Sequence, residues 1–200
     1  MAGFNVDSLR ALLKPEARGG FATTEKYSVI FSNLPRELDQ SVNESLQYLC
    51  ENVAVPTKSI SASDKFIYGT NYQMPYRQTF AESSMSFYCT RDMVEKKFFD
   101  EWQNLIVNPI TGDMKFHNNY TCKIEITQYS KQQEIGSNGV YRIELLNAWP
   151  SIVAEVQYGH SQGGEIAKLP VTFQYEKWIP KNGTAVAAQN SLNSRGRADN

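Results

Sequence analysis

The chain has 200 residues, with 20 basic and 21 acidic side chains and a formal net charge of −1. A nearly neutral chain without long runs of one charge is a poor candidate for gripping nucleic-acid phosphates, and no segment reaches the roughly 20 apolar residues of a membrane span. Three widely spaced cysteines (Cys50, Cys89 and Cys122) favour neither a disulfide framework nor a zinc site, so we expect reduced thiols in a protein that folds in a reducing cytoplasm.

The two ends of the chain differ in composition from the rest. Residues 1–20 carry a short apolar stripe that includes Leu9, Leu12 and Leu13, followed by Pro15. Such a segment is too short to be a stable helix by itself, and we expect an N-terminal arm. Residues 181–200 are rich in Gly, Ala, Asn and Ser, which predicts a flexible C-terminal tail. Residues 21–180 are then the folded β-barrel domain.

Alternation of apolar and polar residues with a period of two predicts β-strands along most of that domain. The pattern appears in seven segments: 27–31, 46–50, 84–89, 122–127, 141–146, 152–158 and 171–176. So many half-buried strands favour an antiparallel β-barrel or sandwich. We therefore predict a mainly β fold with one flanking α-helix.

The segment from Ala54 to Pro75 is less regular. Ser59, Ser61 and Ser63 alternate there with small or apolar residues. This predicts a long exposed loop or a loose hairpin, and loops of that length usually serve a function.

One segment has helical periodicity. Asp92 followed by Glu95 predicts a capped helix start, and Asn108-Pro109 predicts its end. Between them, Phe98 and Trp102 lie on one helical face, which predicts that they pack in the core. We assign Trp149 and Trp178, at the ends of two strand-like runs, to the core or to a subunit contact.

The residues that carry chemistry do not form a recognisable catalytic or metal-binding pattern. His117 and His160 both lie beside turn residues, and neither belongs to a His-x-x-x-His pair. Gly163-Gly164 lacks the Lys-Ser/Thr of a phosphate-binding loop. We predict that the protein is not an enzyme and uses no cofactor and no metal.

Three segments resemble tail tube proteins of contractile-tailed, myovirus-type bacteriophages: the helix core Phe98–Trp102, the segment Tyr141–Pro150 that ends in Ala-Trp-Pro, and the aromatic strand Leu169–Trp178. The resemblance runs from about Tyr27 to Trp178. The family has a small β-barrel or sandwich with one flanking helix, and is related to the haemolysin-coregulated tube protein of type VI secretion.

The resemblance implies a structural virion protein that forms stacked hexameric rings, the inner tube through which DNA is ejected into the host. Its implied partners are copies of itself, the tail sheath protein, baseplate and tail-terminator proteins, and a tape-measure protein in the lumen; DNA passes through without specific binding. The implied location is the virion tail, assembled in the host bacterial cytoplasm.

From these considerations we assign two sets of surface residues. Exposed apolar groups on the arm and the long loop are candidates for contacts between rings: Leu9, Leu12, Leu13, Phe66, Ile67 and Tyr68. Polar strand residues are candidates for the lumen wall: Ser84, Ser86, Glu125 and Thr127.

Three alternatives stay open on the sequence. The chain could be the tube subunit of a secretion-type contractile injection system. It could also be a monomeric β-barrel that binds a ligand in its mouth, or an enzyme on the same barrel. Rings or tubes in electron micrographs would separate a tube subunit from the other two.

Overall fold

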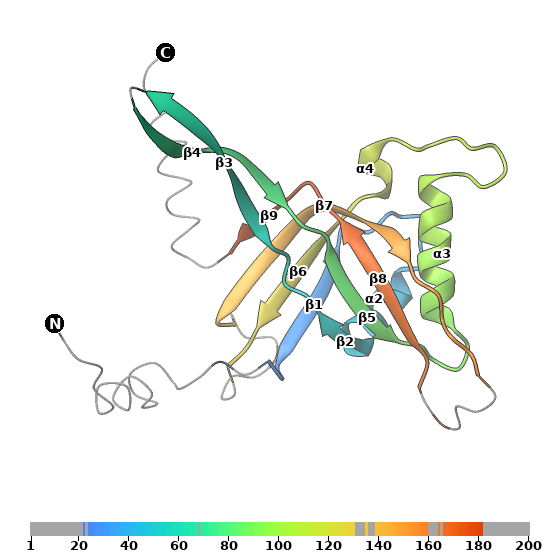
Figure 1. Cartoon of the computed structure of the whole chain (residues 1–200). Helices are drawn as coiled ribbons and strands as arrows, with labels where there is room; N and C mark the ends of the chain where they lie inside the picture. The colour runs from blue at the N-terminus through green and yellow to red at the C-terminus, as the bar shows by residue number, and fades with distance from the viewer. Residues whose placement is uncertain are drawn as a thin grey trace, which may run out of the picture. The chain divides into compact units, whose positions relative to one another are not determined.

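The computed structural model describes residues 22, 24–67, 69–130, 135, 139–159, 164 and 166–181. These residues form β1 (Tyr27–Ser32), α2 (Gln40–Leu49), β2 (Cys50–Val53), β3 (Lys58–Ile67), β4 (Thr70–Phe80), β5 (Ser83–Tyr88), α3 (Val94–Ile106), α4 (His117–Tyr120), β6 (Cys122–Gln128), β7 (Tyr141–Val153), β8 (Lys168–Gln174) and β9 (Lys177–Pro180) (Figure 1). The predicted arm, residues 1–20, and all but the first residue of the predicted tail lie outside the described residues.

The described chain belongs to two compact units. The larger unit comprises residues 29–126 and 143–179, and the smaller one includes the strand ends around Ser28, Gln128 and Arg142. Among the described strands, seven form one sheet in the order β1-β6-β7-β8-β5-β2, with β9 paired to β7. The strands β3 and β4 form a separate two-stranded sheet. The predicted mainly β, antiparallel fold is confirmed.

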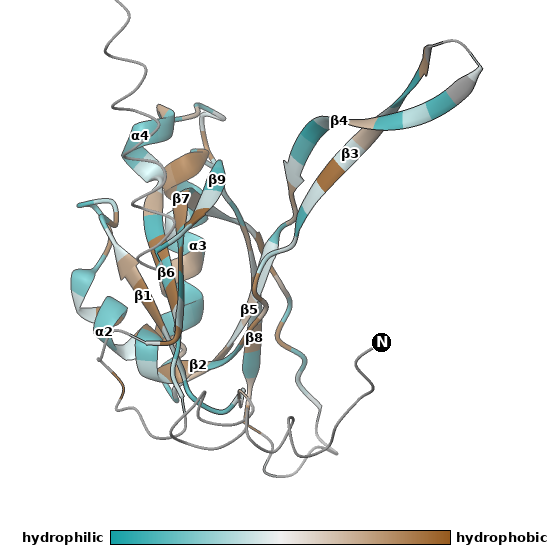
Figure 2. Ribbon diagram, turned by 90° about the vertical axis from the view of Figure 1, so that its left-hand side faces the viewer, coloured by the Kyte–Doolittle hydropathy of each residue, from teal (hydrophilic) through white to brown (hydrophobic). Residues whose placement is uncertain are grey.

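The core of the larger unit lies between the sheet and α3. Phe31 of β1 packs on Phe173 of β8, with ring centroids 5.8 Å apart, although β6 and β7 separate these strands in the sheet. The sheet must therefore be strongly curved, since adjacent strands lie about 4.8 Å apart. Phe99 of α3 closes this aromatic cluster against Phe87 and Phe173, at 5.3 Å and 6.0 Å. Figure 2 shows the alternation of hydrophobic and hydrophilic residues along the strands.

The helix α3 forms where it was predicted, but it starts differently. Asp92 does not cap it: the residue before the helix is Met93, in the left-handed conformation with φ of 53° and without a side-chain cap. The buried Glu95 instead accepts hydrogen bonds from the backbone nitrogen and the hydroxyl of Thr90, at 2.9 Å and 3.0 Å. The carboxylate thus fixes the turn that leads into the helix.

A second flanking helix, α2, replaces the strand that we expected at 46–50. Asp39 caps α2 by accepting a hydrogen bond from the backbone nitrogen of Ser41 at 2.9 Å. Val42 and Leu46, four positions apart, are the buried residues of the helix, so the periodicity is that of a helix. Of the residues 46–50, only Cys50, which begins β2, belongs to a strand.

The two strands expected at 141–146 and 152–158 are one strand, β7, which ends at Val153. Asn147, with φ of 53°, interrupts the alternation without ending the strand. Pro150 is buried and pairs with Phe173, and the register shifts between Pro150 and Ile152. Because proline has no backbone N–H, such a bulge is where a strand tolerates it.

Candidate assembly surfaces

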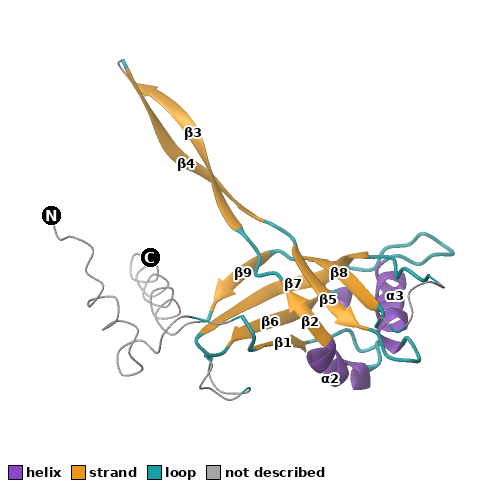
Figure 3. Cartoon of the chain, turned by 60° about the horizontal axis from the view of Figure 1, so that its bottom comes forward, coloured by secondary structure: helices purple, strands orange, loops and turns teal. Residues whose placement is uncertain are grey.

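The segment predicted as a loop or loose hairpin is a regular hairpin. β3 and β4 pair from Lys58↔Phe80 to Ile67↔Thr70. All side chains described in residues 58–66 and 71–78 are exposed, and the hairpin extends away from the seven-stranded sheet (Figure 3). A two-stranded hairpin is marginally stable alone in water, so this one depends on the contacts at its base.

One face of the hairpin carries an apolar stripe. Ser63 pairs with Met74 and Lys65 with Tyr72, and paired residues share a face. Alternation along β4 places Tyr76 on the same side, at the register shift between Ser61 and Ala62. Tyr72, Met74 and Tyr76, here called the hairpin stripe, are 43%, 38% and 79% exposed. Across from Met74 and Tyr76, β3 offers the short side chains of Ser63 and Ser61, whereas Lys65 lies across from Tyr72.

An aromatic cluster anchors the base of the hairpin. The ring of Phe80 lies 6.2 Å from that of Tyr175 and 6.4 Å from that of Trp178, and the Lys58 ammonium lies 5.8 Å from the centre of the Trp178 ring. The Tyr175 hydroxyl donates a hydrogen bond to the carbonyl of Ala81, and burial raises the pKa of Tyr175 to about 12. The half-buried Trp178 therefore belongs to this hairpin anchor and not to the aromatic cluster of the core.

The other predicted core tryptophans differ in exposure. Trp102 is fully buried, and its indole nitrogen donates a hydrogen bond of 2.7 Å to the carbonyl of Tyr120. Phe98, 2% exposed, packs edge-to-face on Trp102. Trp149 is half-buried and packs against Tyr120, with ring centroids 6.3 Å apart.

The candidate lumen residues do not lie together. Ser84 is exposed on β5, and the half-buried Ser86 lies on the same face and donates to Glu51. Glu125 is half-buried on β6, which β7 and β8 separate from β5. Assigning Thr127 to an open wall was wrong, because this side chain is 1% exposed. Gly139 covers it: a Cβ on this glycine would lie 2.4 Å from the Thr127 methyl group.

The candidate residues for contacts between rings fall only partly within the described chain. Phe66, near the tip of the hairpin, is 74% exposed. Ile67 is the last residue of β3. Leu9, Leu12, Leu13 and Tyr68 lie outside the described residues.

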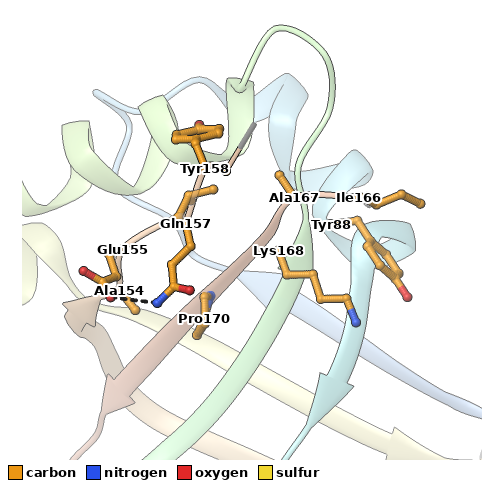
Figure 4. A pocket seen from close by; sticks show the side chains of 11 residues that line it. Tyr88, Ala154, Glu155, Gln157, Tyr158, Ile166, Ala167, Lys168 and Pro170 are labelled. Carbon is orange, nitrogen blue, oxygen red and sulfur yellow. Dashed lines mark hydrogen bonds between the residues drawn. The ribbon is translucent and has the colours of Figure 1, made fainter. Parts of the chain in front are cut away.

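A groove of about 960 Å³ opens beside the end of β5 and the start of β8 (Figure 4). Its lining is formed by Tyr88, residues 154–159, residues 166–168 and Pro170. Two of its apolar side chains, Tyr158 and Ile166, are 77% and 65% exposed. No sequence pattern indicated this groove, because its walls combine Tyr88 with the segments 154–159 and 166–170, which lie far from Tyr88 in the chain.

The charges at the groove are unequally compensated. Lys168 donates a hydrogen bond to Glu51, which lowers the pKa of Glu51, and its ammonium lies 5.6 Å from the centre of the Tyr88 ring. Glu155 accepts a hydrogen bond of 3.2 Å from the amide of Gln157. The partner of Glu51 is therefore a cation, whereas the amide that bonds to Glu155 is neutral and does not balance its charge.

The described residues hold few groups suited to catalysis. Among them, no cluster of three His, Cys, Asp or Glu side chains could bind a metal ion, and no helix is long and apolar enough to span a membrane. His117 lies 3.1 Å from the Tyr120 hydroxyl, and His160 is outside the described residues. Burial raises the pKa of the Cys122 thiol, which disfavours its reactive thiolate.

The described fold is thus a curved, mainly β domain with an exposed hairpin. The chain belongs to the phage tail tube protein family, which matches residues 22–181. No curated protein matches the sequence.

Solved structures of contractile injection systems share the fold. The chain is similar to a sheath/tube terminator of the extracellular system PVC (13% identity over 83% of this chain and 100% of that chain, TM-score 0.60). It is also similar to a chain of the PVC sheath–tube complex (12% identity, 90% and 99% covered, TM-score 0.58). A third similar chain is from the baseplate of the anti-feeding prophage, described as 6-fold symmetrised (8% identity, 80% and 95% covered, TM-score 0.52).

Proposed function

We propose that the chain is the subunit of stacked hexameric rings that form the inner tube of a contractile phage tail, the channel for DNA ejection. Membership of the tail tube family supports the tube. The sheath–tube complex and the 6-fold baseplate among the similar structures support a contractile system and rings of six. The observation that carries the proposal is the hairpin, with its exposed stripe, on a member of this family.

The hairpin supplies the contact between rings in this proposal. Fully burying a large apolar side chain contributes about 1.5–3 kcal/mol, and the hairpin stripe offers three such side chains that the described part of the subunit leaves exposed. Docking on a neighbour would therefore stabilise both the hairpin and the stack. The arm with Leu9, Leu12 and Leu13 is a second proposed contact, and Phe66 a third.

The polar face of β5 is the surface that we propose for the lumen wall. Ser84 and Ser86 lie opposite Thr172 and Pro170 of β8, so this stretch of the face presents short neutral groups, and the charges of Glu51 and Lys168 beside it compensate each other. A wall that is neutral or acidic would limit adhesion of DNA phosphates. We propose that Ser84, Ser86 and Glu125 face the channel, in which the tape-measure protein precedes the DNA.

The remaining partners follow from the same assembly. We propose that the tail sheath protein surrounds the tube, and that baseplate and tail-terminator proteins bind its two ends. The tube is assembled in the host bacterial cytoplasm and becomes part of the virion tail.

A secretion-type injection tube is the second candidate function. It is favoured by the similar structures, which come from an extracellular injection system and from the anti-feeding prophage. Particles purified from the native host would discriminate: phage tubes join a DNA-filled capsid, whereas injection particles have none.

Negative-stain electron microscopy of the purified protein tests the proposal. We expect rings at low concentration and tubes at high concentration or with an added baseplate. A protein that sediments as a monomer at every concentration, alone and with baseplates, would contradict it.

A further inference from the structure

The hairpin and the groove lie at opposite ends of one strand pair. β5 and β8 pair from Ser83↔Phe173 to Tyr88↔Lys168. The hairpin anchor adjoins the first of these pairs, where Tyr175 bonds to Ala81. Tyr88 and Lys168, the last pair, line the groove. A six-residue strand separates its two ends by about 17 Å, so a projection and a recess lie at opposite ends of the same rigid element.

This placement suits a head-to-tail stack. A contact between two different surfaces of the same chain is heterologous, and it repeats along an axis unless the rotation closes it into a ring. A projecting hairpin that enters a recess at the far end of the next subunit is such a contact. Two copies of the hairpin meeting each other would instead end the stack at two rings.

The two surfaces are also complementary in chemistry. The hairpin stripe and the groove residues Tyr158 and Ile166 all expose apolar area. The hairpin carries three cations, Lys58, Lys65 and Arg77, against one carboxylate, Asp64. Arg77 pairs with Ser61 and so lies on the side of the stripe, and the groove offers Glu155.

Resting on the proposed tube function, we infer that the β3–β4 hairpin of one copy docks in this groove of a copy in the adjacent ring. The hairpin stripe packs on Tyr158 and Ile166, and Arg77 pairs with Glu155. The groove is then the receiving surface of the stack, and its volume of about 960 Å³ accommodates several side chains.

A charge exchange tests the pairing. Arg77→Glu and Glu155→Arg, made separately, should each raise the protein concentration needed for tubes at least about fivefold, because each places like charges together in a contact that every subunit repeats. The double variant should restore assembly to near the wild-type concentration. Glu101→Arg, the same charge change on an exposed residue of α3 outside the groove, is the matched control and should assemble normally.

Disulfide formation between introduced cysteines tests whether the hairpin of a neighbouring copy occupies the groove. Tyr76→Cys combined with Ile166→Cys, with Cys50 and Cys89 replaced by serine, should form disulfides between subunits when tubes assemble and not in isolated rings. Disulfides within one chain or within isolated rings would overturn the inference, as would tubes of normal yield from both charge variants. If the wild-type protein forms neither rings nor tubes, the proposed function fails together with the inference; if it forms tubes that these variants leave unchanged, only the inference fails.

Discussion

A buried carboxylate shows how a single residue can set the start of an element. Glu95 is 1% exposed and holds Thr90 through two hydrogen bonds. The bonded turn allows Met93 to adopt a left-handed conformation that is costly for a side chain other than glycine. The pattern of Asp92 and Glu95 predicted the helix correctly. The expected cap by Asp92 does not form, and the hydrogen bonds at the helix start join Glu95 to Thr90.

Trp102 is the residue on which α3 depends most. It is fully buried, stacks on Phe99 and donates to the Tyr120 carbonyl. Trp102→Ala should lower the free energy of unfolding by about 3–5 kcal/mol, because it leaves a cavity and an unbonded carbonyl. Denaturant unfolding measures this. Val94→Ala, at a position 37% exposed on the same helix, should cost less than about 1 kcal/mol; equal losses for both variants would contradict the packing.

Tyr175 predicts a loss of stability at high pH. A phenol ordinarily has a pKa of about 10, and burial raises that of Tyr175 to about 12. The folded state thus holds the proton more tightly than the unfolded chain. This contribution to stability is complete below about pH 10 and is lost as the pH rises toward 12.

The comparison of wild type with Tyr175→Phe tests this prediction. Urea unfolding at a series of pH values between 9 and 12 should show a shallower decline for the variant, which has no proton to lose at this site. Identical slopes for the two proteins would show that Tyr175 titrates alike in both states.

Among the elements, strands with strict alternation were predictable and those with local interruptions were not. β6 and β8 bury every second residue over most of their length. In α2, by contrast, Leu46 and Cys50 fit a period of two as well as a period of four, and the decisive signal was the Asp39 cap. Asn147 hid the continuity of β7, because a left-handed residue within a strand leaves no distinct pattern in the sequence.

The assembly surfaces were predictable only in part. The serines at 59, 61 and 63 indicated an exposed segment, since the residues that alternate with them, Ile60, Ala62 and Asp64, form no continuous apolar face to bury. The stripe could not be assigned to one face, because the register shift at Ala62 decides which side Arg77 and Tyr76 occupy. Thr127 was misplaced because the residue close to its methyl group, Gly139, comes from a later part of the chain.

The hairpin stripe should be dispensable for folding and required for stacking. Met74→Ser combined with Tyr76→Ser changes two exposed residues, so the melting temperature should shift little while the yield of tubes falls at least about tenfold. Pelleting and electron microscopy measure tubes and rings together. Ile60→Ser changes another exposed apolar residue, on the other face near the base, and should leave the yield within about twofold. Loss of rings as well as tubes would contradict a role confined to stacking.

For the whole molecule, the N-terminal arm is expected to act in the assembled state and not in the subunit. Removing residues 1–20 leaves the matched family region, 22–181, intact. The truncated protein should therefore fold and form rings, but lose tubes if the arm bridges adjacent rings as we propose. Analytical ultracentrifugation separates these species. Tubes of normal length and salt resistance would show that the arm is not needed for stacking.

The register shift in the hairpin has a consequence for the geometry of a filament. A bulge adds local right-handed twist to a strand pair, and the one between Ser61 and Ala62 has Tyr76 as its extra residue, so it lies between the anchor and the rest of the stripe. If the hairpin joins successive rings, this bulge helps set the angle by which each ring is rotated on the one below. Because a helical assembly repeats one junction along its whole length, a change of a few degrees there would accumulate over many rings. The helical twist of the tube would then depend in part on one extra residue in β4.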